Sequence, residues 1–242
     1  MRITLPTVIN NPDLEPADPL AGFLRPTFLA GYNMLDTTDF SGNNRNMTYT
    51  GAFNSQGAVL TTARANAMTM PVPEQAGMTV FVCMNIATSG VGSNPRNIIS
   101  NLNSSITPYK GMRVAQRSNS AQADFQWARD TTPFIQGFLG TIAGAWTVRA
   151  LRWTSSVAQM ITHGGAVTQV TPGTLTHTPN PTSPFYFSGI PEGVTAPGVI
   201  NEGCVGTAGM VLFYGEYLND ADCIAYMDKI STNMATRGVV VP

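Results

Sequence analysis

The sequence predicts an all-β fold, a two-sheet antiparallel jelly-roll sandwich with one short C-terminal α-helix and an extended N-terminal arm. From residue 28 onward, short runs rich in β-branched and aromatic residues alternate with clusters of Gly, Pro, Asn and Ser, a pattern typical of sandwiches. In the segment 219–236, by contrast, the apolar residues follow the period of an amphipathic helix. Residues 1–27 contain five prolines and show no sustained period.

Length and charge limit the classes of protein that fit this chain. Its 242 residues match a single all-β domain, which often reaches 200–250 residues, so we divide it into an arm (1–27) and a jelly-roll domain (28–242). Charged residues make up 11% of the chain and the net charge is −1, which gives no global attraction to nucleic acid. No apolar run approaches the roughly 20 residues that span a bilayer. We therefore expect neither a nucleic-acid partner nor membrane insertion.

The N-terminal arm is expected to be extended, because proline fixes φ and removes a backbone donor. Its apolar side chains gain nothing in water, since their stabilising effect comes from burial. We therefore expect the arm to dock on neighbouring subunits. The alternative is an arm that folds back on its own sandwich. The candidate assembly residues are Ile3, Leu5, Val8, Ile9, Phe23 and Leu24.

The clearest strand lies in "GMTVFVCMNI", residues 77–86. Alternation places Met78, Val80, Val82 and Met84 on one face, with Phe81 and Cys83 on the opposite face. Residues 143–165 predict a hairpin that turns near Ser155 and Ser156 and ends at two glycines. Further strands are expected in "AMTMPVP", "RNIISNL", "GMRVAQR", "ADFQWAR", "PFYFSG" and "AGMVLFYGEYL".

The predicted helix carries its own start and stop signals. Asn219 or Asp220 can cap its first turn, and Gly238 suits the position just after its end. The apolar positions share one helical face; they are Cys223, Ile224, Met227, Ile230 and Met234.

Motifs for catalysis are missing from the sequence. Nucleophilic catalysis needs a nucleophile beside a positioned base, yet the two histidines, His163 and His177, accompany no nucleophile motif. The glutamates are scattered, so no two of them share one strand face, as glycoside hydrolysis on a sandwich would require. We expect no enzymatic activity, no catalytic residue and no cofactor.

Two sets of residues are candidates for binding. The loop "LDTTDFSGNN" gathers Asp36, Asp39 and several amide and hydroxyl side chains, which suits a Ca²⁺ site, a sugar site or a turn. Tyr109 and Trp153 are candidate sugar-stacking aromatics, although a core position is the alternative for each. Arginines and tryptophans interleave between residues 113 and 153, which suits a nucleic-acid groove, but alternation along strands accounts for them better.

The order of several motifs resembles the concanavalin A-like lectin/glucanase superfamily, in particular its laminin-G-like members. The likeness covers roughly residues 29–236 and runs through "LDTTDFSGNN", "FNSQGAVLTT", "EQAGMTVFVCMNIA", "GAWTVRALRW", "THGG", "FYFSG" and "GMVLFYGEYLNDADCIAYMDKI". The resemblance implies a jelly roll in which Asp36 and Asp39 act mainly as turn formers, with Ca²⁺ as the lesser alternative. The sequence lacks the paired-glutamate strand of the family's glucanases, which disfavours an enzyme.

A proline-rich arm joined to such a domain, with so little charge, is similar to structural proteins of tailed-phage virions. The resemblance implies a non-enzymatic virion subunit of a tail, fibre, baseplate or capsid decoration, made in the host cytoplasm without a signal peptide. Its partners would be copies of itself, other virion subunits and host-surface glycans. The alternatives are a free carbohydrate-binding module or adhesin and a polysaccharide-degrading enzyme.

Overall fold

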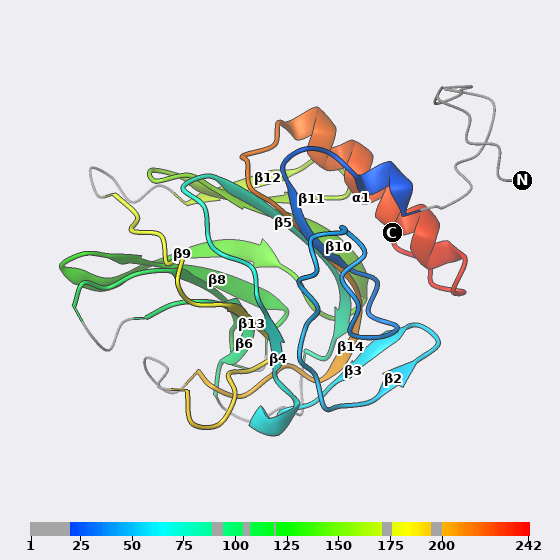
Figure 1. The fold of residues 1–242 in the computed structure, drawn as a ribbon, viewed down its shortest axis with the longest axis horizontal. Coiled ribbons are helices and arrows are strands. Elements are labelled where there is room, and N and C mark those ends of the chain that lie inside the picture. The colour runs from blue at the N-terminus through cyan, green and yellow to red at the C-terminus, as the bar shows by residue number, and fades with distance from the viewer. Residues whose placement is uncertain (1–19, 89–93, 104–106, 119, 171–175, 195–199) are drawn as a thin grey trace, which may run out of the picture.

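A computed structural model describes residues 20–88, 94–103, 107–118, 120–170, 176–194 and 200–242. Two antiparallel sheets pack face to face, and one α-helix lies on the outside of the larger sheet (Figure 1). The predicted two-sheet sandwich with a C-terminal helix is therefore confirmed. Residues 1–19 of the predicted arm lie outside the described residues.

The larger sheet has eight strands, and all its strand pairs are antiparallel. In spatial order they are β12 (Val167–Val170), β11 (Ala158–Thr162), β10 (Trp146–Trp153), β5 (Met78–Ile86), β14 (Gly206–Tyr214), β3 (Gly57–Leu60) and β2 (Phe53–Asn54), with β1 (Phe28–Tyr32) also paired to β14. The predicted hairpin is confirmed as β10 and β11, which Ser155 and Ser156 connect.

The smaller sheet has six strands, again with antiparallel neighbours. Their order is β4 (Met68–Met70), β13 (Phe185–Phe187), β6 (Arg96–Ser100), β7 (Met112–Gln116), β8 (Gln122–Arg129) and β9 (Thr132–Thr141). Two short 3₁₀ turns, η1 (Ala21–Phe23) and η2 (Arg64–Asn66), complete the regular structure of the described residues. The predicted strand segments do not include β2, β3, β9 or β12.

Strand β5 shows how alternation builds two separate cores. Met78, Val80, Val82 and Met84 belong to the apolar cluster between the two sheets. Phe81 and Cys83, on the opposite face, belong to a second cluster that α1 (Asp220–Ala235) covers. The predicted face assignment is confirmed, and both faces of this sheet are buried at its centre.

Helix α1 begins where the sequence indicates, because the Asn219 side chain accepts a hydrogen bond from the Asp222 backbone N–H at 2.8 Å. Cys223, Met227, Ile230 and Met234 are fully buried against the larger sheet. The chain leaves the helix through Gly238, whose φ of 72° suits glycine. Within the described chain, no helix combines the length and the apolar character needed to cross a bilayer.

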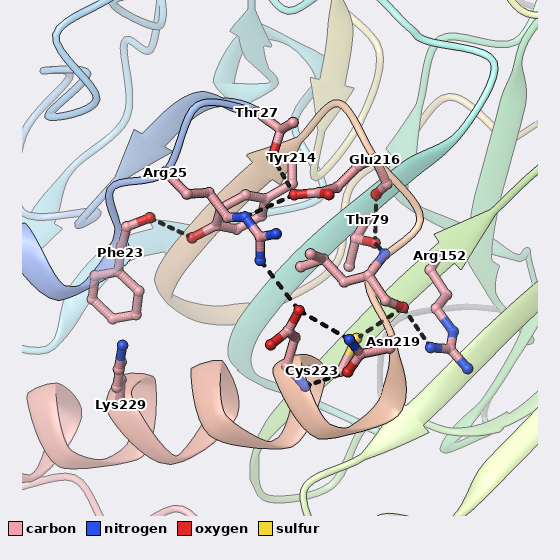
Figure 2. A network of polar contacts seen from close by, with 12 residues as sticks. Phe23, Arg25, Thr27, Thr79, Arg152, Tyr214, Glu216, Asn219, Cys223 and Lys229 are labelled. Carbon is pink, nitrogen blue, oxygen red and sulfur yellow. Dashed lines mark hydrogen bonds and ion pairs between the residues drawn. The ribbon is translucent and has the colours of Figure 1, made fainter.

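Residues 20–27, the last part of the predicted arm, fold back on this chain's own sandwich. Phe23 is fully buried in the second cluster, and its carbonyl accepts a hydrogen bond from the Tyr214 hydroxyl at 2.9 Å (Figure 2). Placing Phe23 among the assembly residues is therefore wrong, because burial under α1 satisfies this side chain within its own domain. Leu24 is 54% exposed. Ile3, Leu5, Val8 and Ile9 lie outside the described residues.

A polar network fastens this segment to the start of α1 (Figure 2). Arg25 contacts Glu216 at 2.8 Å and Asp222 at 3.3 Å, and Thr27 donates to Glu216. The buried Arg152 donates to the Leu218 carbonyl at 2.6 Å. Because Arg25 is partly exposed, its ion pairs contribute little to the stability of the fold, typically about 0–1 kcal/mol each. They fix the path of residues 20–27 relative to α1, while the burial of apolar side chains supplies most of the stability.

Replacing Ile230 by alanine tests the docking of α1. The side chain is fully buried, so Ile230→Ala should lower the free energy of unfolding by about 2–5 kcal/mol, as other buried large-to-small changes do. Urea denaturation followed by circular dichroism measures the loss. Thr232→Ala, on the exposed side of the same helix, is the control. Equal stabilities of the two variants would show that α1 is not docked in this way.

Candidate functional site

The first candidate is a buried polar cluster around Glu74, just after β4. One carboxylate oxygen of Glu74 accepts hydrogen bonds from Trp153 Nε1 at 3.0 Å and His177 Nε2 at 2.7 Å. The other accepts from Asn101 Nδ2 at 2.8 Å and from the Asn180 backbone N–H at 2.7 Å. All five residues are buried, so the carboxylate is fully satisfied and shielded from solvent.

Both ring nitrogens of His177 have partners in this cluster. Nδ1 lies 3.2 Å from the Ala128 carbonyl and Nε2 lies 2.7 Å from Glu74. Trp153 belongs to β10 of the larger sheet and Asn101 follows β6 of the smaller one. The cluster therefore joins the two sheets through buried hydrogen bonds, and we assign it a structural role.

The aromatic candidates have different positions. Trp153 is fully buried and its indole N–H is bonded to Glu74, so its assignment to a sugar-stacking surface is wrong; the buried acceptor explains its inward position. Tyr109 is partly exposed, and its backbone N–H donates to the Asp130 carbonyl at 3.2 Å. A ligand role for Tyr109 stays a prediction.

The aspartates of the early loop act on the backbone around them. Asp39 Oδ1 accepts from the backbone N–H groups of Gly31 and Ser41, each at 2.9 Å, and Oδ2 accepts from that of Arg45 at 3.0 Å. Asp36 accepts from the Thr38 N–H at 2.7 Å. These are the bonds of a turn. Among the described residues, no group of three or more His, Cys, Asp or Glu side chains is arranged to hold a metal ion.

The second candidate lies on the outer face of the six-stranded sheet. The core-facing residues of β7 and β8 include Val114 and Phe125, so alternation turns their neighbours outward. Cross-strand register places Arg113 opposite Gln126 and Ala115 opposite Asp124. Planar polar side chains therefore follow one another along this face.

A pocket of about 430 Å³ opens over these strands, and we call it the outer-face pocket. It is lined by Pro95, Ala115, Gln116, Arg117, Ser118, Asp124, Gln126 and Ile200. Arg117 Nε lies 2.9 Å from both carboxylate oxygens of Asp124, and Arg117 Nη2 lies 2.7 Å from Oδ1. Asp124 is almost buried, while the Arg117 side chain is 44% exposed, so the pair presents a fixed guanidinium to solvent.

One amide side chain, that of Gln126, adds a fixed polar group to the pocket wall, whereas the side chain of Gln116 lies on the core-facing side of β7 with Val114 and is buried. Gln116 Nε2 donates to the carbonyls of Ala87 and Ser120, at 2.7 and 2.8 Å. Its Oε1 is buried and meets no hydrogen-bond donor in the described part of the chain. Gln126 Oε1 accepts from Arg113 Nε at 2.7 Å. Burial lowers the pKa of Arg113 to about 10, which leaves this guanidinium charged at neutral pH.

A second hollow, of about 330 Å³, lies at the β4 edge of the same sheet. It is lined by Thr69, Pro71, Val72, Pro73, Pro181, Thr182, Ser183 and Pro184. Proline and hydroxyl side chains give it no charged or amide group to orient a ligand. The outer-face pocket is the better candidate because its polar groups converge and are held in place.

Sequence reasoning missed both Glu74 and the outer-face pocket. Glu74 follows "PVP" and carries no motif, and its four partners come from three distant parts of the chain. Arg117 and Asp124 stand in the region where arginines and tryptophans interleave, but Trp127 is buried in the core. Strict alternation along 112–116 and 122–129 was the available signal, because it separates the core aromatics from the outward polar residues.

No family model and no curated protein matches the sequence. In fold, the chain is similar to the binding domain of botulinum neurotoxin serotype G (TM-score 0.62, 13% identity, 85% of this chain and 51% of that one). It is also similar to domain 4 of an arabinanase from Geobacillus stearothermophilus (0.58, 11%, 83% and 98%) and to Trypanosoma rangeli sialidase (0.56, 14%, 86% and 33%). The chain spans about half the length of the toxin binding domains. At such identities, the likeness shows the fold alone.

Removing the Glu74 carboxylate tests the structural role of the buried cluster. Glu74→Ala leaves the His177 ring, the Trp153 indole and the Asn180 N–H without their acceptor, so the free energy of unfolding should fall by about 3–5 kcal/mol. Glu192→Ala removes an exposed glutamate and should change little. Chemical denaturation measures both, and a Glu74→Ala protein as stable as the unchanged chain would contradict the assignment.

Proposed function

We propose that this chain is a non-catalytic carbohydrate-binding module that holds a sugar in the outer-face pocket. The observation that carries the proposal is the composition of the pocket wall. The Arg117–Asp124 pair and the amide of Gln126 stand beside apolar Pro95, Ala115 and Ile200. A sugar has hydroxyl groups that pair with planar polar side chains and C–H faces that pack on apolar ones.

Two further points support a sugar ligand without catalysis. Domain 4 of the arabinanase, 98% of which this chain matches in fold, was solved in complex with arabinotriose, so a sandwich of this kind can bind an oligosaccharide. Glycoside hydrolysis uses a pair of carboxyl groups, whereas Asp124 is the one carboxylate among the lining residues. Its pairing with Arg117 suits a fixed binding group rather than an acid or a nucleophile.

Arg117→Ala tests the pocket. This change removes the exposed donor and frees Asp124 from its partner, so affinity for a bound glycan should fall at least about tenfold, or 1.4 kcal/mol. A glycan array identifies the ligand and isothermal titration calorimetry measures its Kd. Lys110→Ala removes a positive charge from a residue outside the pocket lining and should leave the Kd unchanged. Equal binding by both variants would exclude the outer-face pocket as the site.

We further propose that the module is a subunit of a phage virion that assembles with copies of itself and other subunits and contacts host-surface glycans. Two features of the sequence support this setting. Only 11% of the residues are charged, and the cores of protein interfaces are depleted in charge. The first 19 residues combine prolines with apolar side chains, which suits docking on a partner. A free module or adhesin with the same pocket is the alternative.

Deleting residues 1–19 separates assembly from folding. The truncated chain keeps the Phe23 anchor, so its thermal transition and glycan affinity should match those of the full chain, while its oligomerisation should be lost. Size-exclusion chromatography with light scattering measures the oligomeric state. Deleting residues 1–27 also removes Phe23 and Arg25 and should lower the melting temperature. A full chain that is monomeric, or a truncated chain that still assembles, would argue for the free module.

A further inference from the structure

We infer that a second copy of this chain inserts its residues 3–12 into the hollow between residues 71–73 and 181–184, which we call the proline hollow. The inference rests on the proposed assembly of the chain with copies of itself and adds the surface on which one copy holds another. Three features carry it: the way the hollow is built, the chemistry of its walls, and the composition and reach of the N-terminal residues.

The proline hollow is a gap between two segments that are fastened to each other at both of its ends. At one end, Met70 of β4 pairs with Phe185 of β13, the last pair of that ladder. At the other end, a Glu74 carboxylate oxygen accepts a hydrogen bond from the Asn180 backbone N–H at 2.7 Å. The ladder does not continue between these points because proline cannot donate to it, and four prolines occupy the gap: Pro71, Pro73, Pro181 and Pro184. The hollow, of about 330 Å³, is therefore held open between fixed walls.

The walls of the hollow suit an uncharged extended segment better than a small polar ligand. All the lining residues are uncharged, and most of them are prolines, with threonine, serine and valine as the others. Each proline contributes a carbonyl group but no N–H, and the Val72 N–H already donates to the Met70 carbonyl at 2.7 Å. A peptide segment complements such walls, because it brings apolar side chains that gain from burial and N–H groups that donate.

Residues 3–12 have the composition that these walls require. The segment "ITLPTVINNP" contains no charged residue, although Arg2 precedes it and Asp13 follows it. Its threonines and asparagines supply hydroxyl and amide donors for carbonyl groups. Pro6 and Pro12 reduce the conformational entropy that is lost when the segment is fixed on a partner. The large apolar side chains, which are stabilised by burial, are those of Ile3, Leu5, Val8 and Ile9.

The reach of these residues points to the hollow of a neighbouring copy. The described chain begins at Leu20, beside α1 on the outside of the larger sheet, whereas the hollow lies at the β4 edge of the smaller sheet (Figure 1). An extended chain can carry residues 3–12 roughly 25–60 Å away from Leu20, which is far enough to leave this domain and reach another. Two copies related by a two-fold axis can then exchange the segment, each filling the hollow of the other.

Placing a charge in the hollow tests the inference. Thr182→Arg and Thr69→Arg each put a cation among uncharged groups, at a lining residue that is not buried. Each should therefore raise the Kd for self-association at least about tenfold. Thr232→Arg makes the same change on the exposed side of α1 and should leave this Kd unchanged. Sedimentation equilibrium of the full chain measures the Kd, and thermal unfolding checks that all three variants are folded.

Mixing two defective variants identifies the occupant of the hollow. The double variant Leu5→Asp with Val8→Asp puts charge into the segment, so it should also fail to self-associate. Its mixture with Thr182→Arg contains an intact segment on one chain and an intact hollow on the other. The mixture should form heterodimers, more weakly than the unchanged chain forms dimers, although neither variant assembles alone.

The outcomes separate this inference from the proposed function. If Thr182→Arg and Thr69→Arg assemble as the unchanged chain does, the inference is wrong while the proposed assembly stands. The inference is also wrong if mixing restores nothing, as expected when each hollow holds the segment of its own chain, or if the hollow variants lose glycan affinity instead of self-association. If the full chain is monomeric at every concentration, the proposed assembly itself fails, and the test of the outer-face pocket with Arg117→Ala is unaffected.

Discussion

Strands β5 and β14 lie side by side at the centre of the eight-stranded sheet, and nearly every residue of both is buried. Antiparallel sheets commonly leave one face to water, but here both faces carry apolar side chains. One face supplies the core between the sheets, and the other requires a cover of its own. Helix α1 and residues 20–23 provide that cover, so the helix is needed to complete the fold.

This requirement decides which surface remains for a ligand. The outer face of the larger sheet is occupied where Phe81, Leu212 and Tyr214 pack against Met227 and Ile230. The outer face of the six-stranded sheet has no helix on it within the described residues, and its central strands turn charged and amide side chains outward. The outer-face pocket lies there because the fold leaves that sheet free to carry polar groups.

Local patterns were sufficient for most of the elements and insufficient for the polar clusters. Alternation along β5 predicted both of its faces, and the spacing and cap of α1 predicted its bounds to within a residue, because this information lies in adjacent residues. The Glu74 cluster draws on four distant parts of the chain, so no local window contains it. Strand β9 was missed because Pro133, Gly137 and Gly140 look like strand breakers; at the edge of a sheet, where β9 lies, such residues are tolerated.

Residues 20–27 and the pocket are on opposite sides of the sandwich, and this arrangement bears on how the domain could work in an assembly. Residue 20 enters the fold beside α1, on the outer face of the larger sheet (Figure 1). The pocket is on the outer face of the smaller sheet, with the whole sandwich between them. A chain held by its N-terminal residues would therefore present the pocket away from its attachment. Phe23 and Arg25 fix residues 20–27 to the domain, so these residues do not form a hinge. A partner that held the N-terminal residues would therefore also set the orientation of the sandwich.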